Sequence, residues 1–87
     1  MNQSFIIFKA LADETRLKIA VHLAKHKELG CQELSKNFEL SQPTLSHHFG
    51  KLMAAGIILE RKAGQKHFYR INSALLKNSG VDLKLIK

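Results

Sequence analysis

The chain has 87 residues, enough for one small domain, and a formal net charge of +7. Its single cysteine excludes an internal disulfide framework and a multi-cysteine metal cluster. No apolar run approaches the roughly 20 residues that span a bilayer. The basic excess favours a polyanionic partner, of which nucleic acid is the usual example. We therefore expect a single globular domain over residues 1–87, located in the cytoplasm, without signal peptide, membrane association or cofactor.

Apolar residues at helical spacing predict a first helix over residues 4–12. One apolar stripe of this helix is formed by Phe5, Phe8, Leu11 and Ala12. Ile6 and Ile7 lie off that stripe, so the helix is apolar on more than one face. We expect one face to pack on the core and the other on a second subunit.

A second helix is expected to begin after Asp13, whose carboxylate is a good N-cap, and to end before Gly30. Its apolar positions are Leu17, Ile19, Ala20, Val21, Leu23 and Ala24. Because a third, short helix is expected after these two, the sequence indicates a mainly α domain.

Residues 31–55 predict a helix–turn–helix. A short helix over Cys31–Phe38 precedes a turn, and Ser41 is expected to cap a longer helix that tolerates Pro43 in its first turn. The core stripe of the longer helix is expected to be Leu45, Phe49, Leu52 and Met53. Gly56 then ends that helix as a left-handed cap.

Residues 57–71 predict a β-hairpin, the wing, whose strands are joined by a loop containing Gly64. Basic residues gather from the second helix of the helix–turn–helix into the wing: Lys51, Arg61, Lys62, Lys66 and Arg70. Glu60 is the only acidic residue between positions 41 and 70. The combined pattern predicts a fold that is mainly α with a small β-hairpin, a winged helix–turn–helix.

In this plan the second helix enters the DNA major groove, and a basic hairpin reaches the flanking backbone or minor groove. The residues expected to contact DNA are Ser41, Gln42, Thr44, Ser46, His47, His48, Lys51, Arg61, Lys62, Lys66 and Arg70. Within this set, Gln42, Thr44, Ser46 and His47 are expected to read base edges. The predicted function is sequence-specific binding of double-stranded DNA.

Three stretches resemble the ArsR/SmtB-type winged-helix repressors. Residues 11–17, LADETRL, resemble the second-helix signature of that family, and residues 41–49, SQPTLSHHF, resemble its recognition helix. Residues 52–69 resemble its entry to the wing, with Ala55-Gly56-Ile57-Ile58 followed by Arg61, Gly64 and Tyr69. The resemblance implies a homodimer on a near-palindromic operator, usually acting as a repressor.

The chain departs from the metal-sensing members of that family. The three cysteine positions of the arsenic-type site fall on Gly30, Gln32 and Ser35, and Cys31 lies between them. For the zinc-type site of the last helix, the tail after Tyr69 offers only Asp82. We therefore expect no metal site of either kind, and the identity of any effector stays open.

Apolar residues near both ends predict a dimer interface in the terminal segments 1–12 and 72–87. The expected interface residues are Phe5, Ile6, Phe8, Leu83, Leu85 and Ile86. The alternative is that these residues are ordinary core.

Other readings of single residues stay open at this point. His22 and His26 share a helix face as a zinc pair does, although a solvated face is the commoner case. Cys31, near a helix N-terminus, is a candidate redox sensor or a small buried hydrophobe. A winged helix can also bind protein or RNA. We expect no enzyme, because the chain has no paired-carboxylate motif, glycine-rich phosphate loop or nucleophile elbow.

Overall fold

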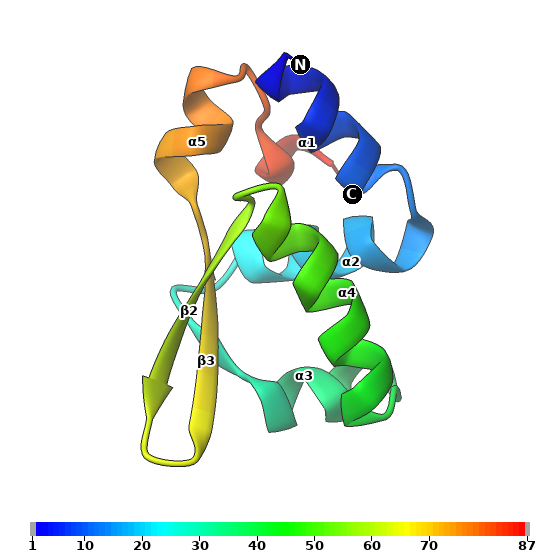
Figure 1. The fold of residues 1–87 in the computed structure, drawn as a ribbon, viewed down its shortest axis with the longest axis vertical. Coiled ribbons are helices and arrows are strands. Elements are labelled where there is room, and N and C mark those ends of the chain that lie inside the picture. The colour runs from blue at the N-terminus through cyan, green and yellow to red at the C-terminus, as the bar shows by residue number, and fades with distance from the viewer. Residues whose placement is uncertain (1, 87) are drawn as a thin grey trace.

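The computed structural model describes residues 2–86, so Met1 and Lys87 of the predicted terminal segments lie outside the described residues. Its elements, in chain order, are α1 (Gln3–Leu11), α2 (Glu14–Ala24), β1 (Leu29–Gly30), α3 (Cys31–Phe38), α4 (Gln42–Ala54), β2 (Ile58–Ala63), β3 (Lys66–Ile71), α5 (Ser73–Asn78) and the 3₁₀ helix η1 (Leu83–Leu85). The helices pack together, and the hairpin lies along one side of them with its turn extending from the body (Figure 1). The prediction of a mainly α fold with a β-hairpin is confirmed. None of the described helices has the length and apolar character that crossing a membrane requires.

The hairpin belongs to a three-stranded antiparallel sheet with the order β1-β3-β2. Strands β2 and β3 pair from Ile58 with Ile71 to Ala63 with Lys66, and Gly64 at φ 64° makes the tight turn. The third strand, in which Leu29 pairs with Tyr69, was not predicted. Two residues are too few to display the alternation by which a strand is recognised.

The core lies where α1, α2, α3 and α4 meet the base of the sheet. Its largest fully buried side chains are Ile7, Ile19, Leu23, Leu34, Leu45, Phe49, Leu52, Ile57 and Ile58. The ring of Phe49 lies 4.2 Å from the ring of Tyr69, centroid to centroid. This contact joins α4 to β3 and holds the helix–turn–helix against the hairpin.

Polar side chains cap the helices where the sequence predicts it. The backbone N–H of Arg16 donates to the Asp13 carboxylate at 2.9 Å, and that of Thr44 donates to the Ser41 hydroxyl at 3.3 Å. The donation from Arg16 holds the pKa of Asp13 below its ordinary value. These caps satisfy amides that have no partner inside their own helix, and they fix where α2 and α4 begin.

The buried residues of α1 and α4 differ in part from the expected ones. Of the predicted stripe of α1 only Leu11 is buried, together with Ile7 from outside the stripe, whereas Phe5 and Phe8 are exposed as a subunit interface requires. The helix contacts α2 and α4 through its Ile7 and Leu11 face. Met53 of α4 is exposed as well, because Leu45, Phe49 and Leu52 already fill the buried side of that helix.

Leu83, predicted at a dimer interface, is only 3% exposed. Its 3₁₀ helix η1 folds back against α2, and Leu83 joins the core cluster of the same chain. The neighbouring Leu85 and Ile86 stay exposed. Of the three tail residues predicted at the dimer interface, Leu83 therefore belongs to the core of its own chain.

Gly56 and Gly50 give a matched test of the turn between α4 and β2. Gly56 has φ 78°, and an added Cβ would lie 3.1 Å from Leu75 Cδ2, whereas a Cβ on Gly50 meets no atom within 4 Å. We expect Gly56→Ala to lower the free energy of unfolding by about 1–2 kcal/mol. Gly50→Ala in the helix interior should raise it by about 0.5–1 kcal/mol. Urea unfolding measures both, and a Gly56→Ala variant as stable as the parent would contradict the assigned backbone.

Candidate nucleic-acid interface

The helix–turn–helix and the wing tip lie at one end of the molecule. In Figure 1 the start of α4 and the β2–β3 turn are at the bottom, whereas α1 and α5 are at the top. A hollow of about 200 Å³ joins the two parts, since Gln42 of α4 and Lys66 of β3 both line it. A surface made by α4 and the wing together is therefore available at that end.

The outward face of α4 is polar. Gln42, Ser46 and His47 are exposed, as is Lys51 one to two turns further along. The Ser41 hydroxyl donates to the Thr44 hydroxyl oxygen at 2.9 Å, so the Thr44 hydroxyl keeps its own proton for donation elsewhere. This face presents amide, hydroxyl and imidazole groups of the kinds that read base edges.

His48 lies apart from this face. Its side chain is only 14% exposed, and its Nδ1 is 3.9 Å from the Asp13 carboxylate at the start of α2. That nitrogen is buried and makes no hydrogen bond to the described residues. We therefore leave His48 out of the DNA-contacting set, in contrast to the sequence prediction, because its ring packs inside the domain.

A hydrogen-bonded carboxylate braces the inner side of the wing. Glu60 Oε2 accepts from the Tyr69 hydroxyl at 2.9 Å and lies 3.0 Å from His67 Nδ1. The bond to His67 is the main cause that holds the pKa of Glu60 below its ordinary value. Burial, followed by the bond to Glu60, raises the pKa of Tyr69 far above its usual range. Since Tyr69 also packs on Phe49, the wing is fixed to α4 on this side.

A second brace fixes the outer side of the wing. The Arg61 guanidinium donates to both oxygens of Glu28, at 2.8 and 3.2 Å, and its carbon lies 4.6 Å from the centre of the Phe68 ring. This pairing lowers the pKa of Glu28 and raises that of Arg61. The charge of Arg61 is therefore largely neutralised within the chain, so it is a weaker candidate for DNA contact than the sequence suggested.

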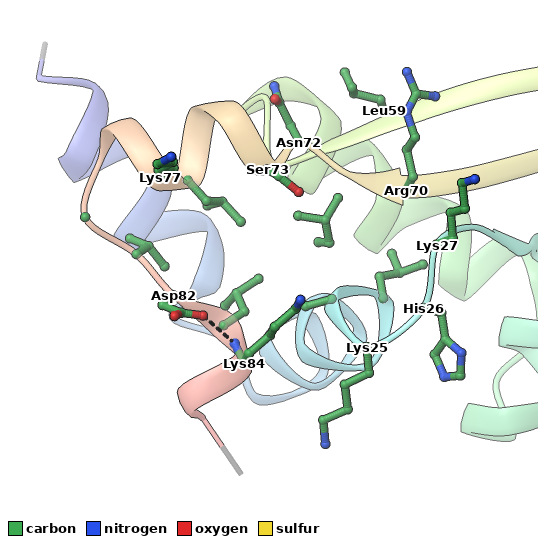
Figure 2. A pocket seen from close by; sticks show the side chains of 17 residues that line it. Lys25, His26, Lys27, Leu59, Arg70, Asn72, Ser73, Lys77, Asp82 and Lys84 are labelled. Carbon is green, nitrogen blue, oxygen red and sulfur yellow. Dashed lines mark hydrogen bonds between the residues drawn. The ribbon is translucent and has the colours of Figure 1, made fainter.

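The remaining basic residues of the wing differ in position. Lys62 and Lys66 are exposed near the turn and form no ion pair within residues 2–86. Arg70 lies at the far end of β3, where it lines a different groove (Figure 2). Lys62 and Lys66 are thus the cations that the wing tip offers to a phosphate backbone.

Two exposed glutamines were missed by the sequence analysis. Gln32 in the first turn of α3 and Gln65 at the wing turn line the same hollow as Gln42. The position of Gln65 beside Gly64 could have marked it as a tip residue, whereas nothing in the local pattern singled out Gln32. Both add hydrogen-bonding amides to the surface formed by α4 and the wing.

The alternative sensor residues gain little support. The His22 and His26 rings lie 4.7 Å apart, and His22 Nε2 is 3.2 Å from the Asn37 side-chain amide. Burial lowers the pKa of His22. No group of three or more potential metal ligands occurs among the described residues. Burial also raises the pKa of the Cys31 thiol, the opposite of what activates a cysteine toward oxidants.

Comparisons with known proteins agree with this geometry. Residues 13–59 match the family model described as bacterial regulatory protein, arsR family. The chain is 43% identical over 67 residues to the arsenic resistance transcriptional regulator ArsR1 of Pseudomonas putida, covering 77% of this chain but only 52% of that protein. It is 40% identical over 80 residues to the arsenical resistance operon repressor of Staphylococcus aureus, covering 92% of this chain and 76% of that protein.

A solved structure gives the same fold. The homodimeric winged helix-turn-helix DNA-binding domain Mb0332 of Mycobacterium bovis superposes with a TM-score of 0.78 at 25% identity. The alignment covers 90% of this chain and 72% of the other. The predicted winged helix–turn–helix and the family resemblance are therefore both confirmed.

The Glu60 brace predicts a pH dependence of stability. The pKa of Glu60 is lowered from an ordinary 4.5, so its stabilising contribution is complete above that value and is lost as pH falls through the lower pKa of the folded state. As pH falls below about 4.5, Glu60→Gln should flatten the fall in unfolding free energy. Tyr69→Phe keeps the carboxylate and its His67 partner, and should retain most of that fall. Equal pH profiles for the parent and Glu60→Gln would contradict the brace.

Proposed function

Because this chain belongs to the ArsR family of bacterial regulatory proteins, we propose that it is a transcriptional repressor that binds an inverted-repeat operator as a homodimer. The observation that carries the proposal is the polar outer face of α4, which lies at the same end of the molecule as Lys62 and Lys66 of the wing. A helix with this face fits the major groove, and the two lysines suit the flanking phosphates.

Each residue of this surface takes a role according to its position. Gln42, Thr44, Ser46 and His47 read base edges, and Lys51, Lys62 and Lys66 contact phosphates. Ser41 positions Thr44 and caps the helix. Arg61 orients the wing through Glu28 and Phe68. Base readout and phosphate contact are thereby assigned to separate groups of side chains.

The proposed dimer interface is at the opposite end of the molecule. Phe5, Phe8 and Leu85 are 52%, 57% and 78% exposed, and Ile6 and Ile86 are each 37% exposed. Exposed aromatic and aliphatic side chains of this kind mark an association surface. The homodimeric Mycobacterium domain of the same fold supports this assignment. Because the proposed interface residues lie near the two chain ends, the helix–turn–helix over residues 31–55 and the wing over residues 57–71 remain accessible to DNA in the dimer.

We also propose that the protein works in the cytoplasm and acts by binding rather than by catalysis. Its relatives are regulators, and the side chains on the α4 and wing surface suit recognition of a duplex.

Two substitutions separate phosphate contact from base readout. Lys66→Ala should weaken binding to all duplexes alike and reduce the slope of log affinity against log salt by about 1. Gln42→Ala should relax discrimination at one base pair by roughly 1–3 kcal/mol. Fluorescence anisotropy over a salt series and a panel of operator variants measures both effects. Lys18→Ala on α2, which removes an exposed cation paired with Glu14, serves as the control and should leave both properties unchanged.

The opposite pattern would overturn the assigned roles. If Gln42→Ala lost affinity uniformly for every duplex, it would not be a readout residue. If Lys66→Ala kept the full salt slope, the wing would not contact phosphate.

The dimer interface is tested by Phe8→Ser. Phe8 is 57% exposed in the single chain, so the variant should keep its fold while losing apolar contact area between subunits. We expect sedimentation velocity to show a shift toward monomer and at least about a tenfold weaker dimer, which corresponds to roughly 1.4 kcal/mol. Met53→Ser removes another exposed apolar side chain, outside the interface, and should remain dimeric. A Phe8→Ser variant that stays fully dimeric would contradict the assignment.

A further inference from the structure

A groove of about 1100 Å³ lies away from the recognition helix. It opens between the C-terminal end of α2, the ends of β2 and β3 near the body, α5 and η1 (Figure 2). No residue of α4 is among its described lining residues. Sites for small molecules commonly measure about 300–1000 Å³, so the groove is large enough for one.

The floor of the groove is apolar. Leu23, Leu76 and Leu83 are buried beneath it, and Ile71 and Val81 are half-buried along it. The Ser73 side chain extends into the hollow between the two ends (Figure 2). The lining includes no aromatic side chain other than His26 among the described residues, so stacking of a nucleobase is not favoured. An aliphatic group fits this floor better.

Positive charge surrounds that floor. The cationic side chains of the lining are Lys25, Lys27, Arg70, Lys77 and Lys84. None of them forms an ion pair within residues 2–86, whereas Lys18 and Arg61 elsewhere are paired with glutamates. Asp82 is the one carboxylate of the described lining, and it accepts from the Lys84 backbone N–H at 3.0 Å. The uncompensated charge favours an anionic ligand.

The two ends of the groove differ in charge. Lys77 and Lys84 share one end with Asp82, and Lys27 and Arg70 lie at the other (Figure 2). Lys27 and Arg70 both help to lower the pKa of Glu28, but the carboxylate of Glu28 is already bound by Arg61. The end beside β3 therefore keeps two uncompensated cations. One of them is a guanidinium, which can bind a carboxylate through two parallel hydrogen bonds.

We propose that this groove binds an amphipathic monocarboxylate of the medium-chain fatty-acid class. The carboxylate contacts Arg70 and Lys27, and the aliphatic chain lies along Ile71, Leu76 and Val81. The groove spans from β3, a strand of the wing, to η1, which leads into Leu85 and Ile86 of the proposed dimer interface. A ligand there is placed to act as an effector. That regulatory step rests on the proposed function, whereas the binding itself does not.

Calorimetric titration with octanoate, kept below its micellar concentration, tests the site on the whole chain. We expect one ligand per chain and amide shifts in nuclear magnetic resonance spectra that are confined to the groove. Arg70→Gln should weaken binding at least about fivefold through loss of a charge-assisted pair. Arg70 is exposed, so the variant should fold. Lys9→Gln, which removes a cation beside the exposed Phe5 and Phe8, is the matched control and should bind as the parent does.

Two further ligands separate the chemistry. Octanol tests the apolar floor alone and acetate tests the charge alone, and both should bind much more weakly than octanoate. The proposal is overturned if octanoate does not bind, if octanol binds equally well, or if Lys9→Gln and not Arg70→Gln loses affinity. If octanoate binds but leaves operator affinity unchanged, the site stands and the effector role fails. Absence of duplex binding both with and without octanoate would count against the proposed function and not against the groove.

Discussion

The contact between Phe49 and Tyr69 is the one on which the DNA-facing surface depends. It joins the centre of α4 to β3 at a ring separation of 4.2 Å, and both side chains are almost fully buried. A hairpin of two strands has little stability by itself in water. Packing against α4 gives the wing its place, and the Glu60 and Glu28 braces then fix its inner and outer sides. The base-reading face of α4 and the phosphate-contacting tip of the wing are therefore held in a fixed position relative to each other.

Local signals predicted much of this architecture. Asp13, Ser41 and Asn72 cap their helices through their own side chains, so their effect is visible in a short stretch of sequence. Gly56 and Gly64 likewise adopt the positive φ that a cap and a tight turn require. The bounds of α3 and β3 also agree with the predicted ones.

What the sequence could not predict depends on contacts between distant segments. The orientation of α1 follows from its packing on α2 and α4, which no periodicity within α1 reveals, so the burial of Ile7, off the predicted stripe, was not foreseen. Arg61 looked available until its partner Glu28, 33 positions earlier in the chain, was placed beside it. His48 and Leu83 were likewise assigned to surfaces before the packing of α2 was known. The sequence shows which residues are charged. It does not show which of those charges are paired with an opposite charge in the folded chain.

The distribution of these charges divides the surface into regions. Lys62 and Lys66 form no ion pair with residues 2–86 at the wing tip, Arg61 is paired with Glu28 on the outer side of the wing, and Arg70 lines the groove beside α5. The net charge of +7 therefore serves more than one surface. Only part of it is positioned to meet DNA, and this part lies opposite the exposed apolar residues of α1.

Sequence-specific binding by a dimer can be tested by selecting bound duplexes from a random pool at near-physiological salt. We expect enrichment of an inverted repeat, with half-sites spaced by one helical turn or a multiple of it, about 10–10.5 base pairs per turn. Salt-sensitive binding without any enriched sequence would contradict the assigned readout by α4, and enrichment of a single unrepeated site would contradict the dimer.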